Sequence, residues 1–178
     1  MSGFSVLSRR RILGAGLTAG GMVLMSGLGL WRLRGAAPGV AGLRILSPHE
    51  YRTLTQLAWA LFPAGGAFPQ GAADADLARL FDGFLADEPE WNQGDLKKAL
   101  LLLEYGPVLF ERRLTTFSHL SEEERLAHFH AWRESSSDLR RQVSTAFHRF
   151  LCTVFYDRPE VWPALGYDGP LVTPEPAQ

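Results

Sequence analysis

The chain of 178 residues contains a single cysteine, Cys152, within the apolar stretch FHRFLCTVFY. One cysteine excludes an internal disulfide and any metal site that is built from two cysteines. Because a free cysteine in apolar surroundings usually behaves as a small hydrophobic residue, we expect Cys152 to be buried and unreactive.

Acidic residues are absent from the first 41 positions, which carry five arginines. The other positions hold 13 basic and 19 acidic residues, so the body of the protein has a formal net charge of −6. A surface of that sign repels the phosphates of nucleic acids, and we therefore expect no nucleic acid partner.

Familiar catalytic motifs are absent too. The sequence has no Gly-x-Ser-x-Gly elbow, no phosphate-binding loop and no dinucleotide fingerprint that follows a strand. His128 and His130 lie two positions apart, so on a helix their side chains diverge by about 200°. A pair of metal ligands on a helix needs a spacing of three or four residues.

The remaining candidates for chemistry have simpler explanations. His49, His119 and His148 lack a local partner and are expected at the surface or at helix ends. Asp74 and Asp76 open a helix, where the helix dipole favours negative charge. We therefore predict no catalytic, cofactor-binding or metal-binding residue, and expect that this chain is not an enzyme by itself.

The first 41 residues have the order of a targeting segment: a basic cluster, an apolar run from Ile12 to Trp31, and then small residues. Six glycines make the run weakly hydrophobic and a poor helix former. The start of the segment resembles the twin-arginine export motif of bacteria, with matching positions at Ser8, Arg9, Arg10, Ile12 and Leu13. We interpret residues 1–41 as a twin-arginine signal that directs the protein to the periplasm.

The fate of this leader is open from the sequence. Gly39 and Ala41 are small residues at a spacing that permits cleavage. Alternatively, the run of 20 residues from Ile12 would span roughly 30 Å as a helix, enough to anchor the chain in the inner membrane. Because the twin-arginine route is known to carry folded proteins, something attached to this leader is expected to fold before export.

The body, residues 42–178, is predicted to be all-α, a bundle of five to six helices with an irregular C-terminal tail. Ser47, Pro48 and Glu50 form a capping box with proline at the first helical position. Gly106 and Pro107 predict an interruption after the third helix. The second helix is predicted to turn one apolar face inward, formed by Leu77, Leu80, Phe81, Phe84 and Leu85. The predicted helices cover residues 47–62, 74–87, 94–106, 121–135 and 136–156, with a short turn at 107–114.

The C-terminal stretch FYDRPEVWPALGYDGPLV places aromatic residues and prolines in no helical order. Tyrosine and tryptophan outside a helical stripe are favoured contact residues in interfaces. Two interpretations are open: the stretch folds back over the core, or it contacts a partner protein. The predicted partner contacts are Tyr156, Trp162, Tyr167 and Pro170.

The helix LSPHEYRTLTQLAWALFP and the ending FYDRPEVWPALGYDGP resemble the gluconate 2-dehydrogenase subunit 3 family, and the likeness covers most of the chain after Leu46. The Leu165-Gly166-Tyr167 and Gly169-Pro170 pieces are its most specific part. The resemblance implies a non-catalytic small subunit whose large partner is a flavoprotein of the glucose-methanol-choline type. That partner binds FAD and oxidises sugars, sugar acids or other alcohols, and a cytochrome c subunit with haem c often takes the electrons. The small subunit would bring the export signal and act as folding and export partner for the pair, at the twin-arginine translocase and the inner membrane surface.

Two other classes of function remain as alternatives. One is a small exported helical enzyme that binds a metal or haem, which would need His128, His130 or His148 to converge with acidic residues. The other is a membrane-anchored scaffold with no flavoprotein partner, in which the leader is retained as the anchor.

Overall fold

A computed structural model describes residues 33–36, 38–66 and 69–170. This part of the chain is helical and contains no strand, so the predicted all-α class is confirmed. The leader residues Ser8, Arg9, Arg10, Ile12 and Leu13 lie outside the described residues. The elements are α2 (Pro48–Leu61), α3 (Leu77–Ala86), α4 (Glu90–Glu111), η1 (Phe117–His119), α5 (Glu122–Arg133), α6 (Asp138–Tyr156), η2 (Pro159–Val161) and α7 (Trp162–Leu165).

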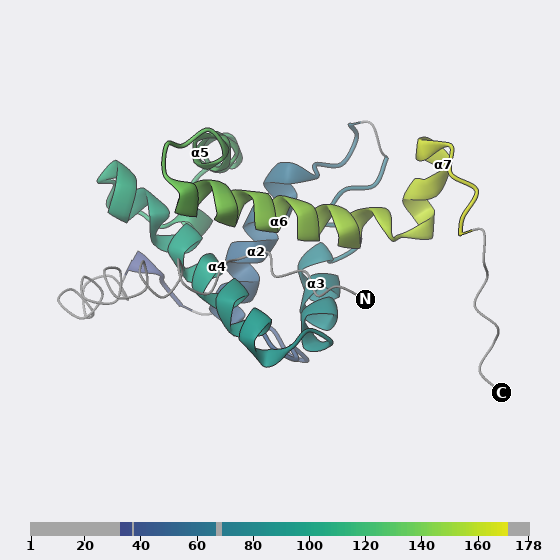
Figure 1. Cartoon of the computed structure of the whole chain (residues 1–178), viewed down its shortest axis with the longest axis horizontal. Helices are drawn as coiled ribbons and strands as arrows, with labels where there is room; N and C mark the ends of the chain where they lie inside the picture. Colours follow the sequence, from purple (N-terminus) through teal and green to yellow (C-terminus); the bar gives the residue numbers. More distant parts are fainter. Residues whose placement is uncertain (1–32, 37, 67–68, 171–178) are drawn as a thin grey trace.

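Helix α2 lies at the centre and packs against α3, α4 and α5, while α6 packs against α3 and α5. Figure 1 shows α6 lying across the other helices, with α5 near its first turns and α7 beyond its last turn. The core between these helices is rich in aromatic residues: Phe81, Phe117, Phe129, Trp132, Phe147 and Phe155 are fully buried. Among the described residues, none of the helices is long and apolar enough to cross a membrane.

The predicted start of α2 is confirmed in detail. Ser47 caps the helix by accepting a hydrogen bond from the Glu50 backbone N–H, and the Glu50 carboxylate accepts one from the Ser47 backbone N–H. Both bonds satisfy amide donors that the first turn of a helix leaves without a helical partner. The capping box therefore fixes the point at which the extended chain before residue 47 becomes helical.

The predicted interruption at Gly106 and Pro107 is wrong, because α4 continues through both residues to Glu111. Proline removes one helical hydrogen bond, but tertiary packing supports the helix at this point. A Cβ atom at position 106 would lie only 2.6 Å from the Trp132 ring and 2.8 Å from His128 Nε2. Glycine thus lets two α5 side chains pack directly on the α4 backbone.

The inward face predicted for α3 is right except at Leu80, which is 43% exposed. Leu77, Phe81 and Leu85 are buried in the core, and Phe84 packs against its edge. The C-terminal stretch is less irregular than expected, because residues 159–165 form the short helices η2 and α7.

Candidate functional site

Residues 33–36 and 38–46, which we call the strap, include the end of the predicted leader, precede α2 and lie against the helical body. Arg52 of α2 donates hydrogen bonds to the backbone carbonyls of Arg34 and Ala36. Arg79 of α3 donates to the carbonyl of Ala41 at 3.0 Å. These side chains thus hold the strap by its backbone carbonyls, while strap residues Leu46 and Ile45 also pack on the core.

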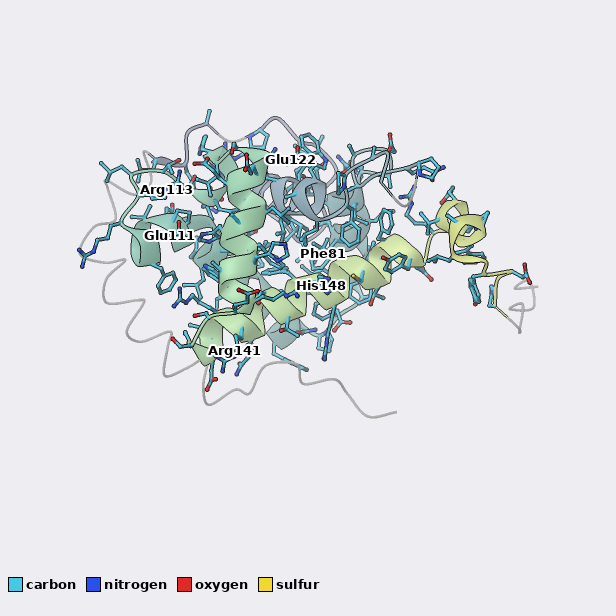
Figure 2. The ribbon with its side chains drawn as sticks, turned by 90° about the horizontal axis from the view of Figure 1, so that it is seen from above. Phe81, Glu111, Arg113, Glu122, Arg141 and His148 are labelled. Atoms are coloured by element: carbon cyan, nitrogen blue, oxygen red, sulfur yellow. The ribbon has the colours of Figure 1, made fainter. Side chains whose placement is uncertain are left out.

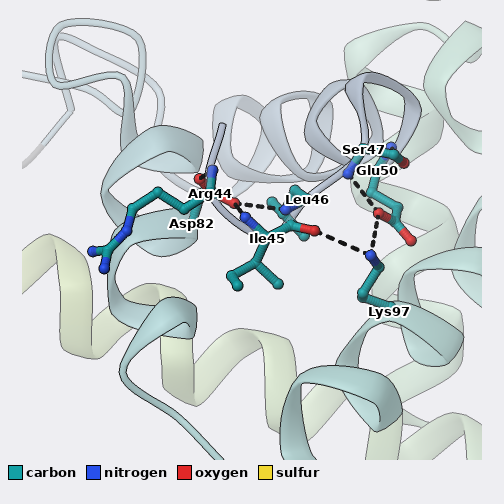
Figure 3. A network of polar contacts seen from close by, with 7 residues as sticks. All are labelled: Arg44, Ile45, Leu46, Ser47, Glu50, Asp82 and Lys97. Atoms are coloured by element: carbon teal, nitrogen blue, oxygen red, sulfur yellow. Dashed lines mark hydrogen bonds and ion pairs between the residues drawn. The ribbon is translucent and has the colours of Figure 1, made fainter. Parts of the chain in front are cut away.

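The strongest part of this attachment is Asp82 of α3, whose side chain is buried. Its carboxylate accepts three backbone hydrogen bonds, from Arg44 at 2.6 Å, Ile45 at 3.0 Å and Leu46 at 2.7 Å (Figure 3). Burying a carboxylate is costly unless it is fully hydrogen-bonded, and charge-assisted bonds are stronger than neutral ones. The three donors offset this cost only while the strap is docked.

Lys97 of α4 closes the same network from the opposite side of the strap (Figure 3). Its ammonium group donates to the Ile45 carbonyl at 3.0 Å and lies 3.5 Å from the Glu50 carboxylate. Asp82 thus accepts hydrogen bonds from backbone N–H groups of the strap, while Lys97 donates one to a strap carbonyl. Helices α2, α3 and α4 together fix residues 44–47.

Nearer the N-terminal end of the strap, Arg34 is buried against the body, and its guanidinium lies 5.6 Å from the centre of the Tyr105 ring. Burial, together with the charges of Arg34 and Arg52, lowers the pKa of His49 below its usual value. His49 is therefore a neutral neighbour of the strap at physiological pH. This part of the predicted 1–41 segment packs on the body as an ordered extension of it.

The four predicted partner contacts lie at the last residue of α6, Tyr156, and in the segment that follows it, and they differ in exposure. Trp162 packs against the core and donates from its ring nitrogen to the Tyr156 carbonyl at 2.9 Å. Tyr167 lies edge-on to Trp162 with ring centres 5.3 Å apart, and it is 46% exposed. Tyr156 is 40% exposed, and Pro170 is exposed as well. Trp162 therefore joins the tail to the bundle, while Tyr156 and Tyr167 face outward.

Two adjoining hollows, which we call the α6 groove, lie along the outer side of α6. They have volumes of about 860 and 610 Å³, and Phe84 and Thr153 line both. Trp91 and Phe150 line the larger hollow, and Trp91 is 42% exposed. No sequence pattern predicted this groove, since its walls come from separate parts of the chain: α3 and the turn before it, the start of α4 and the turn before it, α6 and η2.

Cys152 lines the larger hollow and is only partly buried, so the prediction of a buried residue is wrong. Its sulfur lies 3.9 Å from the ring nitrogens of His148, one helical turn earlier. Burial raises the pKa of the thiol, which makes the thiolate scarce at neutral pH. Cys152 is thus an accessible thiol of low intrinsic reactivity.

The histidines that the enzyme alternative needs lie apart. His128 is buried and pairs through Nδ1 with Glu111, whereas His130 on the same helix is exposed. Figure 2 shows His148 on α6, away from Glu111. Burial lowers the pKa of His128, although the Glu111 carboxylate opposes the shift. In residues 33–36, 38–66 and 69–170, no three His, Cys, Asp or Glu side chains gather as a metal site.

The other candidates serve local structure. Asp76 caps α3, and it accepts hydrogen bonds from the Tyr51 hydroxyl at 2.6 Å and from Arg79. Asp74 accepts from the Gly71 backbone at 2.7 Å. His119 ends η1, where its Nδ1 lies 2.8 Å from the Thr116 hydroxyl. These contacts give both aspartates a role beyond the helix dipole.

No protein-family model, no curated protein and no solved structure matches this chain. The features of the chain that bear on its function are the leader motif, the strap, the C-terminal surface and the groove. Among these, the strap is the feature that ties the leader to the folded body.

Proposed function

We propose that this chain is the non-catalytic small subunit of a periplasmic FAD-dependent dehydrogenase complex. It supplies the twin-arginine signal for a flavoprotein large subunit of the glucose-methanol-choline type, which has none of its own. The flavoprotein binds FAD and oxidises an alcohol, sugar or sugar acid, and a cytochrome c subunit with haem c accepts the electrons. The small subunit acts as folding and export partner, and its leader meets the twin-arginine translocase at the inner membrane.

The observation that carries this proposal is the way in which the leader is joined to the body. A leader that exports a second protein must stay attached to the folded carrier while the carrier holds its cargo. The side chains of Arg52, Arg79 and Lys97 donate to backbone carbonyls of the strap, and the Asp82 carboxylate accepts from its backbone amides, so the attachment is spread over the strap. Such an attachment gives the start of the body a fixed geometry relative to the segment that carries the leader, which supports a role as carrier.

The cargo-binding surface in this proposal is the C-terminal end, where Tyr156, Tyr167 and Pro170 lie exposed. Rigid aromatic side chains are favoured anchors of interfaces. Prolines at positions 159, 163 and 170 restrict the chain before binding, so less entropy is lost when it docks.

The test replaces both Arg9 and Arg10 with lysine in cells that also produce the flavoprotein. Lysine keeps the charge but not the planar fork of arginine, so a purely electrostatic leader would tolerate the change. We expect both proteins to stay in the cytoplasm. Arg11→Lys is the matched control, since Arg11 lies outside the matched positions, and it should export both proteins normally. Periplasmic arrival of both proteins with the double variant would contradict the proposal.

A further inference from the structure

The two ends of the α6 groove differ in chemistry. The larger hollow has an apolar floor from Phe84, Trp91 and Phe150, with Glu88, His148 and Arg149 also lining it. The smaller hollow is lined by three carboxylates, Asp74, Asp157 and Glu160, beside Leu80 and Val154.

Arg158 is the basic residue of the smaller hollow, but its charge is engaged. Its guanidinium lies 3.6 Å from the Glu160 carboxylate and 5.6 Å from the centre of the Phe155 ring, and only 13% of its side chain is exposed. The groove therefore suits a ligand in which a basic part precedes or follows an apolar part.

The leader has this two-part composition. Arg9, Arg10 and Arg11 come directly before the apolar run from Ile12 to Trp31, and the segment has no acidic residue. Along α6, the groove extends from His148 to Asp157, about 14 Å at the rise of a helix. The 32 leader residues that precede the strap are long enough to lie over both hollows at once. An apolar run of this length is also an aggregation liability when exposed to water.

We propose that the leader docks in the α6 groove of its own chain, with its arginines at the acidic end and its apolar run over the floor of the larger hollow. The folded body then covers the signal until the export machinery takes it. This inference does not require the flavoprotein, so its test and the test of the proposed function can fail separately.

Cys152 provides a built-in probe, because it lines the groove and is the sole cysteine of the chain. The experiment measures how fast a maleimide labels Cys152 in the purified full-length chain and in the variant Val23→Asp/Leu24→Asp. Two aspartates in the apolar run oppose docking, and neither position belongs to the described core. We expect labelling of the variant to be about tenfold faster. The variant Arg9→Gln/Arg10→Gln/Arg11→Gln should give a smaller increase.

In a matched control, Cys152 is replaced and a new cysteine is introduced at an exposed position outside the groove. Leu114 is 86% exposed and does not line the groove, so the variant Cys152→Ser/Leu114→Cys should be labelled at one rate with either leader. Thermal melts check that all variants have the same folded body. Equal labelling of Cys152 with the intact and altered leaders would overturn the inference. Labelling that speeds up on dilution of the intact chain would overturn it too, because a second copy would then cover the groove.

Discussion

The two ends of the body hold their adjoining segments by different physics. The strap is fixed by buried polar groups, since Asp82 accepts three backbone hydrogen bonds and Lys97 donates to a strap carbonyl. The segment after α6 is joined to the bundle through the buried Val161 and the partly buried Trp162, and this end of the body presents exposed aromatic surface at Tyr156 and Tyr167. Buried polar networks impose one geometry, whereas exposed aromatic side chains are favoured anchors in protein interfaces. We therefore call the strap side the holding end, and the C-terminal side, which we propose binds the partner, the binding end.

The largest effect is expected at the holding end. Asp82→Asn removes the buried negative charge and leaves amide donors of the strap poorly paired, so the free energy of unfolding should fall by about 3 kcal/mol. Urea unfolding of the purified chain measures this change. The control is Asp87→Asn, whose side chain is 82% exposed and 4.0 Å from Arg44, and it should change stability by less than about 0.5 kcal/mol. If both variants lowered the free energy of unfolding equally, the buried Asp82 would contribute no more to stability than the exposed Asp87.

At the binding end, Tyr167→Ala should lower the affinity of the chain for the flavoprotein. Tyr167 is half exposed and its ring contact is with Trp162, so the isolated chain should lose little stability. Affinity for the flavoprotein should fall by about 2 kcal/mol, roughly thirtyfold. Calorimetric titration of the two purified subunits measures it. A large drop in melting temperature with unchanged affinity would show that Tyr167 serves the fold.

Trp162→Ala should affect both properties, because this side chain connects the tail to the core. Loss of its core contacts and of its hydrogen bond to the Tyr156 carbonyl should lower stability by about 1.5 kcal/mol. Thermal melts of Trp162→Ala and Trp162→Phe separate packing from the hydrogen bond, since phenylalanine keeps most of the ring. An unchanged melt for Trp162→Ala would mean that the tail is not packed on the bundle in solution.

The smallest effect is expected from acid at Asp76, which caps α3 and accepts hydrogen bonds from Tyr51 and Arg79. Although burial raises the pKa of Asp76, hydrogen bonds from Tyr51 and Arg79 outweigh it and hold this pKa below its usual value. The stabilisation is therefore present above the ordinary aspartate pKa and is lost as the pH falls through the lowered value. Between about pH 5 and pH 2, wild type should lose more stability than Asp76→Asn. Parallel stability profiles for the two proteins over this range would contradict the assignment.

The start of α2 could be predicted because its signals are local. Ser47, Pro48 and Glu50 lie within four positions, and each acts on the same helical turn. The continuation of α4 through Pro107 could not be predicted in this way, since the support comes from His128 and Trp132 on another helix. Local propensity gave the wrong result where tertiary packing outweighed it.

The strap contacts were also hidden from the sequence. Asp82 and its three donors are separated by 36–38 positions, and nothing in the residue types distinguishes Asp82 from an exposed helix aspartate. Likewise, the exposed Leu80 fits the apolar period of α3 but lies at the rim of the α6 groove. The candidate functional features thus depend on which helices meet, whereas the helices themselves depend on local patterns.

The central claim, that this chain carries a flavoprotein through the twin-arginine route, is tested most directly by the absorbance spectrum of what it brings out of the cell. The chain is tagged at its C-terminus, produced together with the flavoprotein and recovered from the periplasmic and membrane fractions. We expect the flavoprotein to be recovered with it, together with one flavin per complex and alcohol- or sugar-oxidising activity. Recovery of the exported chain alone, without flavin, while the flavoprotein reaches the periplasm by itself or stays inside, would contradict the account.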